Sequence, residues 1–288
     1  MNVDEKTMIK AYLFDWGDTL MVDFPGVKGK MCDWEKIEVI NYAKETLATL
    51  SQVSKIYVAT GAANSSEKDI QRAFKRAGLN QFISGYFCQE NVGCEKGSSD
   101  FLNRILDTLN IDSQHVAMVG DTIDKDIKPA LSVGIKAFWF NEKQRVTPLE
   151  FESNEHVVII NKLTDLYLNH ELICQRFPVW ESLSELFLDT EITECTRAHI
   201  ASVLANSEYS LEVLQDILYY EVYPVLKYNL LSVAGEWAGF NREWLIESLV
   251  PKINKRSMFS LPLFNKWMFD KEWKEICLRI SSLRLQQG

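Results

Sequence analysis

Polar residues suited to phosphoryl transfer stand at or near the ends of short apolar runs. Asp15 ends YLFD, Thr60 ends KIYVAT, Lys96 lies in GCEKGSSDF, and Asp121 and Asp126 belong to GDTIDKD after VAMV. A carboxylate could act as nucleophile, a hydroxyl and an ammonium could hold phosphoryl oxygens, and further carboxylates could hold a hard cation. Singly, each has an ordinary explanation as a turn former, strand residue, surface lysine or helix cap. Their order along the chain favours a common site.

The elements that must position these residues are short strands alternating with helices. The runs too short for helices are 8–14, 55–59, 116–119, 136–140 and 157–160. Helical spacing of apolar residues predicts helices over 34–50, over 65–77 and from Phe101 to Leu109. Such alternation predicts a Rossmann-like parallel sheet, an α/β fold whose ligands bind beyond the carboxyl ends of the strands. Thr60 and the following amides of Gly61 and Ala62 then lead toward a helix N-terminus, where anions bind.

The second half of the chain has a different pattern. From about Ile173, leucines and aromatic residues recur at three- or four-residue spacing, as in Leu211, Leu214 and Leu218. We therefore expect two domains, an α/β core over 1–172 and an all-α domain over 173–288.

The motifs of the first half resemble those of the haloacid dehalogenase (HAD) superfamily. An apolar strand followed by Asp15 resembles its first motif, Thr60 the second, Lys96 the third, and GDTIDKD, with Asp121 and Asp126, the fourth. The resemblance covers roughly 8–165 and implies a Mg²⁺-dependent hydrolase, with a phosphatase favoured, in which Asp15 forms a phosphoaspartyl intermediate.

The resemblance also implies roles for the surrounding residues. Mg²⁺ would lie between the Asp15 carboxylate, the Gly17 carbonyl and Asp121, with Asp126 acting through a metal-bound water or by orienting Lys96. Thr60, Gly61 and Lys96 would bind the phosphoryl oxygens of a phosphorylated small molecule or macromolecule.

One departure from the family pattern concerns proton transfer. The family's phosphatases usually carry a second aspartate two positions after the nucleophile, and here that position is Gly17. Asp18 lies one residue further and would project elsewhere on a regular turn. A slow phosphatase, an enzyme for esters with good leaving groups, and an attenuated HAD scaffold serving as a regulatory or protein-interaction module all stay open.

A second departure concerns the cap that covers the site in many family members. Only 44 residues separate Asp15 from Thr60, and 35 separate Thr60 from Lys96. Both gaps are filled by predicted core elements, so the resemblance is to the capless type. We expect residues 173–288 or a partner subunit to supply a lid.

Composition narrows the classes of partner. The formal net charge is −9, which argues against a nucleic-acid partner. No apolar run is long enough to cross a membrane, and the six cysteines lack metal or disulfide spacing, so we expect a cytoplasmic protein. The stretch 179–250 resembles a bacterial domain of uncharacterised function. We expect 173–288 to mediate a protein contact or homo-oligomer.

Overall fold

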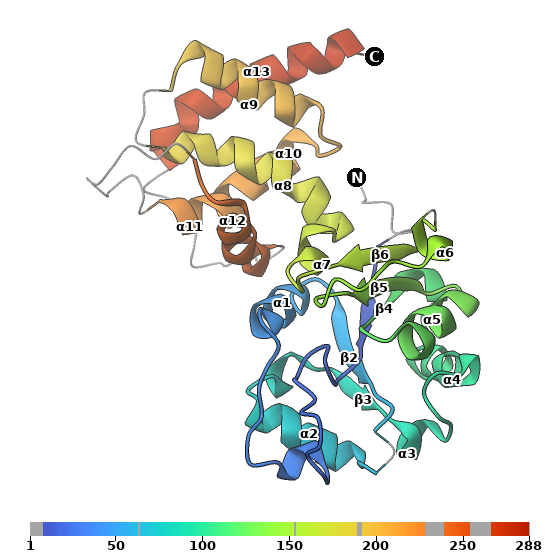
Figure 1. Cartoon of the computed structure of the whole chain (residues 1–288). Helices are drawn as coiled ribbons and strands as arrows, with labels where there is room; N and C mark the ends of the chain where they lie inside the picture. Colours follow the sequence, from blue (N-terminus) through green and yellow to red (C-terminus); the bar gives the residue numbers. More distant parts are fainter. Residues whose placement is uncertain are drawn as a thin grey trace. The chain divides into compact units, whose positions relative to one another are not determined.

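The computed structural model describes residues 8–62, 64–152, 154–188, 192–227, 239–253 and 266–287. These residues divide into two compact units, and the division falls between Glu171 and Leu172. The first unit is α/β and the second is helical (Figure 1).

The first unit is built on a six-stranded sheet in the order β3-β2-β1-β4-β5-β6, and all neighbouring pairs are parallel. The strands are β1 (Ala11–Phe14), β2 (Lys55–Ala59), β3 (Gly85–Phe87), β4 (Val116–Gly120), β5 (Lys136–Phe140) and β6 (Val157–Ile160). The predicted parallel sheet is confirmed, and β3 is an additional edge strand. The chain changes direction across the sheet between β1 and β4, so the carboxyl ends of these two strands flank the expected ligand crevice.

Helices cover both faces of this sheet. They are α1 (Ala43–Leu50), α2 (Glu67–Arg76), α3 (Gln89–Val92), α4 (Ser99–Leu109), α5 (Lys128–Ser132), α6 (Leu149–Glu152) and α7 (Asp165–Leu168). Figure 1 shows α1 and α2 on one side of the sheet and α4 and α5 on the other. Because successive strand residues point to opposite faces, Leu13 packs in the cluster that contains Phe101 of α4, while neighbouring Tyr12 and Phe14 are buried facing the other way.

The helix predicted over 34–50 is wrong in its first half. The α1 helix begins only at Ala43, after Tyr42 with a left-handed φ of 64°. Before it, the chain runs alongside the loop that follows β1: the Val22 N–H donates to the Glu38 carbonyl at 2.9 Å, and the Ile40 N–H donates to the Leu20 carbonyl at 3.0 Å. These backbone hydrogen bonds between distant segments override the helical spacing of the apolar residues.

No separate cap domain is inserted within the described part of the first unit. Between Asp15 and Thr60 the chain forms a 3-10 turn at Met31–Asp33, helix α1 and strand β2. Between Thr60 and Lys96 it forms α2, a short 3-10 turn, β3 and α3. These elements belong to the layers of the core itself.

Helices joined by turns make up the described part of the second unit. Its helices are α8 (Glu171–Ser184), α9 (Glu194–Ala205), α10 (Leu211–Asp216), α11 (Tyr223–Leu226), α12 (Arg242–Leu249) and α13 (Lys266–Gln287). Helices α9 and α13 pack against each other, and Trp273, Ile276 and Ile280 of α13 are buried. A buried ion pair joins Arg176 to Glu221 at 2.9 Å. Across the described chain, no helix has both the length and the apolar character needed to cross a bilayer.

Candidate functional site

Asp15 lies at the centre of the sheet's carboxyl edge. Every residue of β1 is buried, and the Asp15 N–H continues the pairing by donating to the Val119 carbonyl of β4 at 2.8 Å. Its carboxylate is therefore held at the crevice by two central strands, with 15% of the side chain exposed. The buried Thr19 hydroxyl lies 3.5 Å from Asp15 Oδ2.

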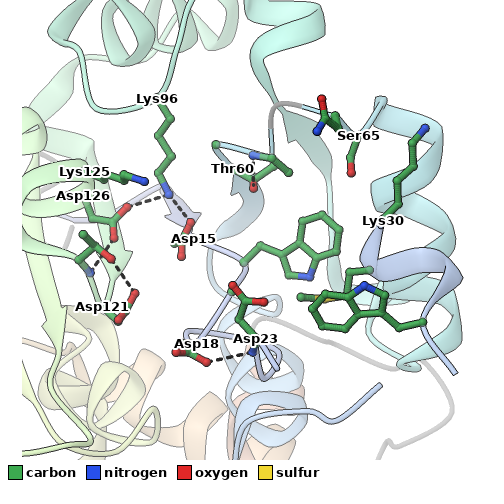
Figure 2. A pocket seen from close by; sticks show the side chains of 18 of the residues that line it. Asp15, Asp18, Asp23, Lys30, Thr60, Ser65, Lys96, Asp121, Lys125 and Asp126 are labelled. Carbon is green, nitrogen blue, oxygen red and sulfur yellow. Dashed lines mark hydrogen bonds and ion pairs between the residues drawn. The ribbon is translucent and has the colours of Figure 1, made fainter. Parts of the chain in front are cut away.

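A buried lysine joins Asp15 to a second carboxylate. Lys96 Nζ forms ion pairs with Asp15 Oδ1 and, at 2.7 Å, with Asp126 Oδ1 (Figure 2). Only 4% of the Lys96 side chain is exposed. Burial favours loss of the proton, but the two carboxylates outweigh burial and raise the pKa of Lys96. Lys96 is thus a fixed positive charge beside the proposed nucleophile.

The loop after β4 brings Asp121 and Asp126 to the same edge. A π-helical turn at Ile123–Ile127 follows the strand, and the Thr122 N–H donates to Asp126 Oδ2 at 2.9 Å. Close packing requires glycine at position 120, because a Cβ atom there would overlap the Asp126 carboxyl group. The sequence motif GDTIDKD therefore combines a close backbone approach with two inward carboxylates.

The three carboxylates form an oxygen-rich cluster. One carboxylate oxygen from each of Asp15, Asp121 and Asp126 lies within 4.8 Å of the other two. Burial raises the pKa of Asp126 to about 6 against the opposing effect of Lys96, and burial also raises the pKa of Asp121. Crowded, partly desolvated carboxylates of this kind suit a hard divalent cation, and Gly17 lines the same cavity. The donor set therefore fits Mg²⁺.

Thr60 and Gly61 form the opposite wall. Thr60 is buried, and its Oγ1 accepts a hydrogen bond from the Ala62 N–H at 3.2 Å. A Cβ atom on Gly61 would lie 3.4 Å from Lys96 Cβ, so this turn packs beside the lysine stem. Since α2 begins only at Glu67, after the Ser66 cap, Thr60 and Gly61 lie in a loop at a distance from the helix N-terminus.

These residues surround one cavity of about 530 Å³. All seven residues predicted for the site line it, namely Asp15, Gly17, Thr60, Gly61, Lys96, Asp121 and Asp126. Lys125 and Lys30 also line it, although the Lys30 ammonium pairs with Asp69 at 2.6 Å, and Trp16 and Trp34 add aromatic surface. The cavity can therefore hold an anionic group next to Asp15, with room for an attached organic part.

The carboxylate of Asp18, the residue one position beyond Gly17, is held by other parts of the chain. Asp18 adopts a left-handed φ of 52°. Its Oδ1 accepts a hydrogen bond from the Asp23 N–H at 2.9 Å, and its Oδ2 pairs with Lys143 at 3.1 Å. Both carboxylate oxygens thus have structural partners.

Sequence reasoning missed the residues that hold Asp121. The Trp139 indole N–H donates to the Asp121 carbonyl at 3.0 Å, and Arg145 bonds the same carbonyl and lies 3.4 Å from Asp121 Oδ2. The guanidinium also lies over the Trp139 ring, 5.6 Å from its centroid. Their position at and after the end of a predicted strand was the available signal.

Comparison with known proteins defines the class of each unit. Residues 27–134 match the family model for haloacid dehalogenase-like hydrolases, and residues 174–280 match DUF7079, a domain of unknown function. The chain therefore contains a HAD-like hydrolase core followed by a DUF7079 domain. The hydrolase match begins after Asp15, so the place of Asp15 in the site comes from the sheet geometry.

Two curated relatives share part of the core. YfnB of Bacillus subtilis strain 168, named as a HAD-hydrolase, is 22% identical over 131 residues, which are 45% of this chain and 53% of YfnB. Pyrimidine 5′-nucleotidase YjjG of Escherichia coli strain K12 is 28% identical over 101 residues, 35% of this chain and 45% of YjjG. The chain thus spans about half the length of these relatives. A crystal structure of an uncharacterized protein from Listeria monocytogenes serotype 4b matches with 23% identity and a TM-score of 0.49, covering 55% of this chain and 94% of that one.

Proposed function

We propose that the core is a Mg²⁺-dependent phosphatase that works through a phosphoaspartyl intermediate on Asp15. The observation that carries this proposal is the convergence of Lys96, Asp15 and Asp126 in a polar cavity at the carboxyl edge of the sheet. A buried ammonium beside a strand-end carboxylate places positive charge where the transferring phosphoryl group would lie.

Each residue has a role in this reaction. An Asp15 carboxylate oxygen attacks phosphorus, and the bond from phosphorus to the leaving oxygen breaks, which leaves an acyl phosphate on Asp15. Lys96 and Thr60 bind phosphoryl oxygens and stabilise the charge that spreads over them. Water then attacks phosphorus, which releases inorganic phosphate and restores the carboxylate.

Asp15, Asp121 and Asp126, with the Gly17 carbonyl, would hold the metal. Bound Mg²⁺ neutralises negative charge on the phosphate and on the nucleophile, which would otherwise repel each other. Asp126 would also orient Lys96, through the ion pair of 2.7 Å between Asp126 Oδ1 and Lys96 Nζ.

The substrate class proposed is a phosphate monoester. Five aspartates line the cavity against three lysines, so a dianionic group would bind there through Lys96, Lys125 and the bound cation together. The hydrolase family match favours an enzyme over a regulatory scaffold. The name of YjjG, a nucleotidase, supports monoester hydrolysis. Trp16 and Trp34 are largely buried but line the cavity, and such aromatic lining is compatible with an aromatic group on the ester.

The test is phosphate release from a panel of phosphate monoesters with and without Mg²⁺, for the wild-type protein and the isosteric Asp15→Asn variant. We expect Mg²⁺-dependent release by the wild type and none by the variant, with both proteins giving the same circular dichroism spectrum. Equal release by the two proteins would rule out the nucleophilic role of Asp15.

A further inference from the structure

The backbone conformation at Gly17 does not require glycine, and the missing side chain leaves space in the cavity wall. Its φ lies outside the left-handed range in which a side chain is strained, unlike the φ of 84° at Gly26. A Cβ atom added to Gly17 would meet Asp23 at ordinary contact distances, 3.5 Å from Cβ and 3.6 Å from Oδ2. The Asp23 carboxylate therefore lies beside the position that a side chain of residue 17 would enter.

The loop after β1 folds back to bring Asp23 there. Gly17 forms a bridge to Met21, and Met21 in turn pairs with Val39. The left-handed turn at Asp18 allows its carboxylate to bind the Asp23 N–H at 2.9 Å, which fixes the backbone of residue 23. The loop thus places the Asp23 carboxylate beside position 17, where the sequence lacks the aspartate that the family's phosphatases usually carry.

The Asp23 side chain points into the cavity. Figure 2 shows its carboxylate directed toward the side of the pocket that holds Asp15, while the Asp18 carboxylate lies below it. Both Asp23 and Asp15 line the cavity, and the Asp23 side chain is solvent-exposed. Asp18 uses both carboxylate oxygens on Asp23 and Lys143, which leaves Asp23 as the carboxylate placed for chemistry.

We propose that Asp23 is the acid–base residue for the reaction at Asp15, an inference that rests on the phosphatase proposed above. In the first step, as the bond from phosphorus to the leaving oxygen breaks, protonated Asp23 gives its proton to that oxygen. In the second, water attacks the phosphorus of the acyl phosphate, the bond to Asp15 breaks, and the water proton passes to Asp23. The proton balance closes over the cycle, and Asp23 ends as it began.

A leaving-group comparison separates the two steps. With an alkyl phosphate, whose alkoxide needs the proton, we expect Asp23→Asn to lower kcat/KM by about 10² to 10⁴, the usual contribution of general acid–base catalysis. With 4-nitrophenyl phosphate the phenolate leaves unaided, so kcat/KM is nearly unchanged while kcat falls at the water step. This variant then shows a stoichiometric burst of nitrophenolate followed by slow turnover, which a purely structural role would not produce.

The matched control is Asp124→Asn, which removes an exposed carboxylate outside the cavity lining and should leave both substrates unaffected. Adding Gly17→Asp to the Asp23→Asn variant should restore alkyl phosphate hydrolysis, because the new carboxylate enters the same space. If Asp23→Asn matches the wild type on both substrates while Asp15→Asn is inactive, the role of Asp23 is refuted and the phosphatase stands. If the wild-type protein hydrolyses neither ester with Mg²⁺, the phosphatase is refuted and the role of Asp23 with it.

Discussion

Gly120→Ala should damage both the stability and the activity of the core. The added Cβ would lie 2.6 Å from Asp126 Cβ and closer still to its carboxyl group. Asp126 is 1% exposed and is held by Lys96 Nζ at 2.7 Å and by the Thr122 N–H at 2.9 Å. The methyl group therefore forces Asp126 to move and breaks at least one of these contacts.

The size of both effects follows from this overlap. Overpacking a buried site costs about 1 to 3 kcal/mol. At about 2 to 4 °C per kcal/mol for a unit of this size, Tm should fall by roughly 2 to 12 °C. Because Asp126 orients Lys96, a displacement of about 1 Å should also lower kcat/KM by about 10²-fold.

Thermal unfolding and phosphomonoester kinetics measure the two effects. Gly78→Ala is the matched control, since Gly78 is exposed at the end of α2 and an added Cβ would meet nothing within 4 Å. Its left-handed φ of 70° should cost some stability while kcat/KM stays unchanged. If Gly120→Ala keeps the wild-type Tm and kcat/KM, the close approach between Gly120 and Asp126 is refuted.

Three further predictions concern the metal, the buried ion pair and pH. Mg²⁺ at 100 times its Kd should stabilise the wild-type core by about 2.7 kcal/mol and the Asp121→Asn variant less, as differential scanning fluorimetry with Mg²⁺ titration would detect. Glu221→Ala should destabilise the helical unit by about 3 to 5 kcal/mol in urea unfolding, because it removes the carboxylate that pairs with the buried Arg176 guanidinium. A variant as stable as the wild type would contradict this. The hydrogen bond from Arg197 lowers the pKa of Glu272. The ion pair therefore stabilises the helical unit at pH values above the unfolded pKa of about 4.3, and this contribution is lost as the pH falls through the folded pKa. Urea unfolding between pH 5 and about 2.5 should show that Arg197→Gln loses less stability on acidification than the wild type.

The α/β core was predictable because its central strands β1, β4 and β5 are almost wholly buried and read as short apolar runs. Parallel strands carry the residues that follow them to one edge, so the order of Asp15, Thr60 and Asp121 after their strands was enough to place them around one cavity. The geometry of Lys96 was not predictable in detail, since its ion pairs with Asp15 and Asp126 depend on a loop and a π-helical turn.

Features that depend on contacts between loops could not be read from local patterns. Helical spacing predicted a helix from residue 34, whereas backbone hydrogen bonds from Val22 to Glu38 and from Ile40 to Leu20 pair that segment with the loop after β1. The approach of Asp23 to Gly17 has the same origin. A lid supplied by 173–288 or by a partner subunit stays a prediction.

The phosphoaspartyl intermediate on Asp15 is tested most directly by mass spectrometry of the protein quenched in acid during turnover of a phosphate monoester with Mg²⁺. We expect one phosphoryl group on the peptide that contains Asp15 in the wild-type protein, a larger phosphorylated fraction in the Asp23→Asn variant and none in Asp15→Asn. Phosphate release with no phosphoryl group on that peptide, at the same rate in wild type and Asp15→Asn, would contradict it.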